Sequence, residues 1–294
     1  MTATGMETSG HLEVTQSRAM VSEWIKFRSL RSTWWSIGIA LLVSVGLGIL
    51  SSDLRGNDIA NHGGFERDPT ALSLRGFYLA QLAAGVLGVL FITGEYSTGM
   101  IRATLSAVPR RVPVWVAKIV IFAVVIFGIT LVAAFIAFLG GQAVLAGYHV
   151  PAGFTVAPDG GVVFTPGVAG GTLHSLGVSI SHPGSVRAIF GAALYMVGVG
   201  LLGLGCGFII RNTGGAIAAL FGLLLVLPLL AQALPSSLQQ DVSKYLPLLA
   251  GTAIMNATQR GTDQLAPWTG LGVFALYVAA ALGLGLYVLR RRDA

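Results

Sequence analysis

The sequence predicts an all-α membrane protein: a six-transmembrane-helix bundle with an N-terminal amphipathic interface helix and both termini in the cytoplasm. Two observations predict this class. Hydrophobic residues make up 54% of the 294 residues and charged residues only 10%. Long apolar stretches without Asp, Glu, Lys or Arg recur along the chain, and a helix of about 20 such residues crosses a hydrocarbon core of about 30 Å.

The predicted spans follow these apolar stretches and belong to one transmembrane domain, residues 32–294. We expect them at about residues 33–51, 76–94, 113–140, 188–210, 214–234 and 268–289. The apolar stretches contain no ionisable side chain, whereas proton- and ion-coupled transporters usually carry such groups inside their spans. We therefore expect no ionisable group at bilayer depth and no ion coupling through side chains, and Na⁺ held by backbone carbonyls is the alternative.

The orientation follows from the distribution of Lys and Arg. Alternating the connections of six spans assigns most basic residues to one side, namely Arg18, Lys26, Arg28, Arg31, Arg102, Arg110, Arg111, Lys118, Arg211, Arg290, Arg291 and Arg292. The positive-inside rule assigns that side to the cytoplasm. The pI of about 9.8 would suggest nucleic acid in a soluble protein, but basic residues beside membrane spans predict no nucleic-acid partner.

The N-terminal lead divides into two parts. Residues 1–13 are polar and are expected to be disordered. Residues 14–31 show helical periodicity, with Met20, Trp24 and Phe27 on one face and Lys26 on the opposite face. Such a basic amphipathic helix is expected in the membrane interface, either as an anchor that sets topology or as a docking surface for a cytoplasmic partner.

Two outer regions have recognisable patterns. Between Gly153 and Phe164, a Pro-Asp-Gly-Gly turn separates two β-branched and aromatic runs, which predicts a hairpin. Residues Pro235–Pro267 are too apolar for a free loop and too interrupted for a span, so they predict short interfacial or re-entrant helices. Three outer histidines, His149, His174 and His182, lack the ligand spacing of a metal site, and we predict none.

Glycines recur in the fourth span at spacings that let helix backbones approach closely. They are Gly191, Gly198, Gly203, Gly205 and Gly207. Small residues at such spacings are typical of helix contacts in lipid. The pattern is compatible with packing inside one bundle or with a dimer seam.

The connection after the second span has the most structured pattern of the cytoplasmic side. From Glu95 to Arg111 the spacing predicts a short helix that Pro109 ends, with Ile101, Leu105 and Val108 on its apolar face. Its polar face holds Glu95, Thr98, Gly99, Arg102 and Ser106. Such a helix, tied to membrane helices at both ends, would move them if a partner held it. It is equally typical of a solvated loop helix that touches anionic lipid.

Three passages resemble the membrane subunits (permeases) of bacterial type-2 ABC exporters. Ser22–Trp35 is similar to that family's amphipathic helix before the first span. Glu95-Tyr-x-x-Gly99, followed by Thr104-Leu-Ser-Ala-Val-Pro-Arg-Arg111 and Lys118, is similar to its acid, Gly and Leu-x-x-x-Pro-x-Arg pattern before a Lys. Tyr245-Leu-Pro247 is similar to the stretch before its last span. Met100-Ile-Arg differs from the Thr-Leu that relatives often have.

The resemblance implies a non-enzymatic permease in a bacterial cytoplasmic membrane. It would pair with a second copy or a related chain, and ATP would bind to separate ABC ATPase subunits, because this chain has no P-loop. The implied ATPase-coupling residues are Glu95, Gly99, Arg102, Pro109, Arg110 and Arg111, and those of the interface helix are Glu23, Trp24, Lys26, Arg28 and Arg31. The expected cargo is hydrophobic or amphipathic and moves by alternating access. The alternative is a channel or membrane scaffold that is not driven by ATP.

Overall fold

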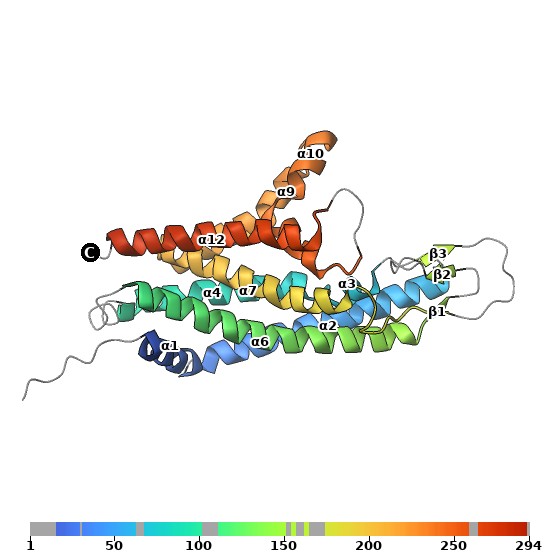
Figure 1. The fold of residues 1–294 in the computed structure, drawn as a ribbon, viewed down its shortest axis with the longest axis horizontal. Coiled ribbons are helices and arrows are strands. Elements are labelled where there is room, and N and C mark those ends of the chain that lie inside the picture. Colours follow the sequence, from blue (N-terminus) through green and yellow to red (C-terminus); the bar gives the residue numbers. More distant parts are fainter. Residues whose placement is uncertain are drawn as a thin grey trace, which may run out of the picture.

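Long helices run side by side along the longest axis of the molecule (Figure 1). The computed structural model describes residues 16–29, 31–62, 68–101, 111–150, 154–156, 162–164, 174–258 and 264–292. The segment predicted to be disordered, residues 1–13, lies outside them. Helix α1 (Gln16–Ser29) and the C-terminal end of α12 (Pro267–Arg292) lie at one end of the bundle, and the strands lie at the other (Figure 1).

In the part of the chain that the structure describes, six helical segments are long and apolar enough to cross a membrane, which confirms the predicted six-helix bundle. They lie in α2 (Arg31–His62), α4 (Phe77–Ser97), α6 (Arg111–Ala146), α7 (Ser185–Ile210), the run from α8 (Thr213–Phe221) to α9 (Leu227–Ala231), and α12. Helices α2 and α6 have 32 and 36 residues. At about 1.5 Å per residue, both exceed a core of about 30 Å, so they project beyond it.

The fifth span is irregular, because a π-helical segment, η1 (Gly222–Val226), joins α8 to α9. Pro228 follows in the first turn of α9, where it cannot donate to the helical ladder. Helix α9 and the next short helix, α10 (Ser236–Ser243), lean away from the other helices (Figure 1). The predicted short helices between the last two spans are therefore present, as α10, α11 (Pro247–Thr252) and η2 (Ala253–Met255).

Helix α7 is the centre of the bundle, with α4, α6 and α12 packed around it. Its glycines allow these close approaches. A Cβ at Gly203 would overlap the main-chain carbonyl of Gly85 in α4, and one at Gly205 would lie 2.8 Å from the Ala281 side chain in α12. The other three would overlap side chains of the same chain: Gly191 with Ile254, Gly198 with Phe274, and Gly207 with Ile92. The five predicted packing glycines thus lie against other elements of one bundle.

Buried polar side chains join the helices at the end opposite α1. The amide of Gln142 in α6 donates to Pro69 O at 2.8 Å and to Ser73 Oγ at 2.9 Å, and its oxygen accepts from Val178 N at 2.8 Å. Pro69–Ser73 forms the short buried helix α3, whose N-cap is Asp68. The amide nitrogen and oxygen of Gln142 thus both have partners, which offsets the cost of burying them.

The described residues include four short strands beyond this end. Strand β2 (Phe154–Val156) pairs antiparallel with β3 (Val162–Phe164), with Phe154 opposite Phe164, which confirms the predicted hairpin. Strand β1 (His149–Val150) pairs with β4 (His174–Ser175). Within the described residues no group of three His, Cys, Asp or Glu side chains is placed to hold a metal ion.

Candidate functional site

Four charged side chains from three helices meet at the end of the bundle where α1 lies. Glu23 and Lys26 come from α1, Glu95 from the last turn of α4, and Lys118 from the first turns of α6. We call these four side chains the charged cluster. It joins segments that are up to 95 residues apart in the chain.

Both ammonium groups of the cluster bridge both carboxylates. Lys118 Nζ donates to Glu23 Oε2 and to Glu95 Oε1, each at 2.6 Å. Lys26 Nζ donates to Glu23 Oε1 at 2.8 Å and to Glu95 Oε1 at 3.1 Å. Such charge-assisted hydrogen bonds are shorter and stronger than neutral ones. Two acids and two bases balance in charge, so the cluster is neutral as a whole.

The cluster is largely removed from solvent. The Lys118 side chain is fully buried, Glu23 is 2% exposed, and the Lys26 side chain, at 23%, is the one nearest to solvent. Burial penalises a charged group unless it is paired, and here every charge has a partner of opposite sign. Among the described residues, Glu95 Oε2 is buried without a hydrogen-bond partner.

Local packing explains why α1 turns Glu23 inward. Phe27 lies one turn after Glu23, hence on the same face of α1, and is 1% exposed. Its ring packs edge-on against Phe91 of α4, with centroids 5.5 Å apart, and against Trp34 of α2, at 5.9 Å. Lys118 Nζ lies 5.1 Å from the Phe91 ring centroid, a cation–π distance. Phe27 and the charged cluster therefore belong to one surface, through which α1 contacts α4 and α6.

The pKa of Lys26 is raised above its usual value of 10.5. Burial by itself lowers the pKa of this amine. The hydrogen bonds and the negative charges of Glu23 and Glu95 oppose burial and together outweigh it. Lys26 is therefore positively charged throughout the physiological range.

Two residues of the charged cluster lie within helices that are long and apolar enough to cross a membrane. Glu95 lies near the end of the candidate span Phe77–Ser97, and Lys118 lies near the start of the candidate span Arg111–Ala146. That no ionisable group lies at bilayer depth stays a prediction. Lys118 lies seven residues after the start of α6, which is about 10 Å along a helix. Lys118 therefore lies near one end of this long span. The long apolar sequence that follows it makes a single charge hard to recognise as part of a site.

The predicted helix from Glu95 onward is interrupted. Helix α4 continues through Glu95 to Ser97, and the chain then turns at Gly99, whose φ is +70°. This left-handed conformation is readily accessible only to glycine, so Gly99 is the point where the direction changes. Glu95 consequently belongs to the end of a span, and it does not share a continuous helical face with the residues that follow Gly99.

Two arginines hold the last turn of α12 at the same end of the bundle. Arg111, a predicted coupling residue, donates to Leu289 O at 2.6 Å and to Arg290 O at 3.0 Å. Arg211 donates to Val288 O at 3.3 Å, and its guanidinium lies 5.2 Å from the Tyr96 ring centroid. The carbonyls of Leu289 and Arg290 are among the last four of α12, which lack partners within the helix, and a cation there also complements the helix dipole.

The remaining predicted site residues differ in their placement. Trp24 and Arg28 are exposed on α1, and Arg31 is the first residue of α2. Arg102, Pro109 and Arg110 lie outside the described residues. Lys118 ends the motif that begins at Glu95, and the sequence pattern by itself assigns it no role. The sequence signal for this pair was a single Lys in the first turns of one predicted span and a single Glu directly after the preceding predicted span.

Comparison with known protein families matches this part of the chain. The family described as ABC-2 family transporter protein matches residues 19–165, which is half of the chain. The matched stretch contains all four residues of the charged cluster and the helices α2, α4 and α6. Among curated proteins, none matches the chain.

Proposed function

The chain belongs to the ABC-2 transporter family, and from this premise we propose that it is the permease subunit of an ATP-driven exporter. As a multi-pass membrane protein of that family it is a transport component that works with an ABC ATPase. The proposal adds that ATP binds on that partner alone, that energy enters through α1 and the connection after α4, and that transport runs outward by alternating access.

The charged cluster is the observation that carries this proposal. It bonds α1 directly to α4 and α6, through Glu23 on one side and Glu95 and Lys118 on the other. A displacement of α1 by a partner would therefore be transmitted to two spans without passing through flexible chain. The exposed side chains Val21 and Ile25 leave one face of α1 available for the partner.

The chemistry of the charged cluster supports a role in transmitting the movement of α1 to α4 and α6 more than a role in stabilising the fold. Apolar residues of similar volume often replace a buried ion-pair network without loss of stability. Carboxylates and ammonium groups instead impose a fixed register, because each hydrogen bond needs a particular geometry. In the proposed cycle, closure of the ATPase dimer pulls on α1, and the cluster makes α4 and α6 follow. The outer helices α11 and η2, packed against α7 and α12, would then release the cargo.

The proposed setting is the cytoplasmic membrane of a bacterium. The end that carries α1, Arg111, Arg211 and the last turn of α12 would face the cytoplasm, as the distribution of basic residues predicts. Two permeases, either two copies or this chain with a related one, would enclose the pathway. The mostly apolar spans favour a hydrophobic or amphipathic cargo.

ATP hydrolysis by the purified complex tests this proposal. The full chain is expected to co-purify with an ABC ATPase that is co-expressed with it. Glu95→Gln keeps the shape of the side chain but removes its charge, and it should lower ATP turnover and transport in proteoliposomes while the complex still assembles. Asp241→Asn is the control, because Asp241 is 79% exposed on α10.

Two results would contradict the proposal. The first is ATP turnover and transport that are unchanged in Glu95→Gln and in the paired Glu23→Gln variant. The second is ion conductance by the isolated chain in planar bilayers without nucleotide, which would favour the channel. Size-exclusion chromatography of each variant distinguishes loss of coupling from loss of folding.

A further inference from the structure

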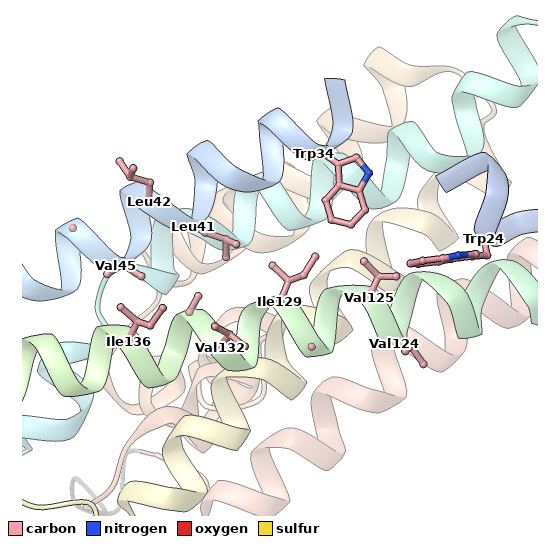
Figure 2. A pocket seen from close by; sticks show the side chains of 13 residues that line it. Trp24, Trp34, Leu41, Leu42, Val45, Val124, Val125, Ile129, Val132 and Ile136 are labelled. Atoms are coloured by element: carbon pink, nitrogen blue, oxygen red, sulfur yellow. The ribbon is translucent and has the colours of Figure 1, made fainter. Parts of the chain in front are cut away.

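An apolar groove of about 910 Å³ runs along the outside of the bundle between α2 and α6. Every residue that lines it is apolar or aromatic. Leu41, Leu42, Val45 and Gly46 form one wall, and α6 forms the other from Val124 to Ile136. Trp34 and Trp24 lie toward one end of the groove (Figure 2). The groove is separate from the charged cluster, whose side chains do not line it.

The dimensions of the groove match one leaflet of a bilayer. The α6 wall from Val124 to Ile136 covers twelve residue steps, or about 18 Å at the helical rise. Half of a hydrocarbon core of about 30 Å is about 15 Å. The groove therefore extends over the depth that a single acyl chain occupies, starting from the end of the bundle where α1 lies.

The Trp end of the groove has the character of a membrane interface, where Trp side chains concentrate. Trp34 Nε1 donates to the main-chain oxygen of Arg28 at 3.4 Å, so the end of α1 lies directly beside the groove. Arg28 is exposed, and it lies one turn after Trp24 on the same face of α1. The positive charge of Arg28 thus lies at the depth of the lipid headgroups, next to an apolar groove that can hold an acyl chain.

We propose that this groove retains one acyl chain of an anionic phospholipid whose headgroup contacts Arg28. Lipid tails are as apolar as the groove, so apolar contact alone does not select one lipid over another. Selection must come from the headgroup, and Arg28 supplies a positive charge that complements a phosphate with a net negative charge. The retained lipid would fill the space between α2 and α6 and brace α1 against the bundle. This inference is independent of the proposed coupling to an ATPase.

Native mass spectrometry of the full chain tests this site. The protein, purified in a mild detergent, is supplied with equal amounts of phosphatidylglycerol and phosphatidylcholine that have identical acyl chains. The unaltered protein should retain phosphatidylglycerol about fivefold better than phosphatidylcholine, the effect of about one surface-placed basic residue. Arg28→Gln should remove that preference and leave the retention of phosphatidylcholine unchanged.

Filling the groove tests the position of the acyl chain. A Cβ added at Gly46 or Gly128 meets no atom within 4 Å, and both glycines line the groove, so the double variant Gly46→Leu/Gly128→Leu should fill it. It should lose most of the retained lipid. Gly283→Leu is the matched control, because Gly283 in α12 is equally unobstructed and lies outside the groove.

The proposal is overturned by equal retention of the two lipids in the unaltered protein, which would indicate ordinary contact with the bilayer. It is also overturned if the double leucine variant retains phosphatidylglycerol as the unaltered protein does. Arg28→Gln lies on an exposed surface and leaves the groove intact, so its result is informative even if the double variant folds poorly.

Discussion

The ammonium group of Lys118 in α6 donates to the carboxylate of Glu23 in α1 at 2.6 Å, across 95 residues of chain. This contact joins a helix that precedes the first span directly to the third span. Glu95 adds the contact from α4. Three helices that are separated along the chain are thereby joined at one point, at the end of the bundle.

Removing the central cation should destabilise the protein strongly. Lys118→Met keeps the length of the side chain but leaves the carboxylates of Glu23 and Glu95 buried with only Lys26 between them. Breaking a buried ion network from one side costs about 3–5 kcal/mol. Thermal unfolding in detergent should show a large decrease in Tm. Lys244→Met, which removes a pair with the 79% exposed Asp241, should change Tm little. A similar Tm for both variants would contradict the assigned role.

The attachment of α1 should weaken at alkaline pH. The pKa of Lys26 in the folded protein is raised above 10.5. A raised lysine pKa contributes stability that is fully present below the unfolded value and is lost as pH rises through the folded value. The contribution should therefore be constant between about pH 6 and 9 and decrease above the usual lysine pKa. Tm is measured from neutral pH to above the usual lysine pKa in the unaltered protein and in Lys26→Met. The difference between the two proteins isolates the contribution of Lys26. An identical alkaline decrease in both proteins would assign the effect to other groups.

Close contact between α4 and α7 should not tolerate a side chain at Gly203. A Cβ there would overlap the carbonyl of Gly85, which belongs to the backbone and cannot move independently. Gly203→Val should separate the two helices and lower the free energy of unfolding by about 1–3 kcal/mol, the usual range for overpacking. Gly283→Ala is the control, because nothing lies within 4 Å of its added methyl group, and its better helix propensity should be neutral or stabilising. Denaturation in detergent compares the two, and equal stability would contradict the packing argument.

Arg111 should protect the end of α12 from fraying. Arg111→Gln removes the donors to Leu289 O and Arg290 O, and hydrogen bonds from charged groups contribute about 1.5–3 kcal/mol. Amide hydrogen exchange in the last turn of α12 should therefore become about tenfold faster or more. Arg290→Gln, which keeps the Arg290 carbonyl, is the control. Unchanged exchange in Arg111→Gln would leave direct contact with the ATPase as the role of this residue.

Parts of the architecture could be predicted because they depend on local pattern. Six helical spans follow from uninterrupted apolar length, since each must satisfy its own backbone hydrogen bonds in lipid. The hairpin from Phe154 to Phe164 follows from a turn sequence between two β-forming runs. The short helices α10, α11 and η2 follow from a region that is neither polar enough for a loop nor apolar enough for a span.

The site depended on information that a linear pattern does not contain. Helical spacing placed Lys26 on the polar face of α1, but which charge it meets depends on how α1 packs against α4 and α6. Lys118 was overlooked because a single charge at the end of an apolar run resembles a flanking residue. Its complete burial depends on Glu23, a residue on a different helix.

By itself, the sequence determined that this protein spans the membrane with six helices, because hydrophobic length is a local property read directly by the bilayer. Only the tertiary structure decided that Glu23, Lys26, Glu95 and Lys118 form one neutral cluster, and that α2 and α6 leave an apolar groove between them. Both are contacts between distant segments, and their geometry exists only after the helices have packed.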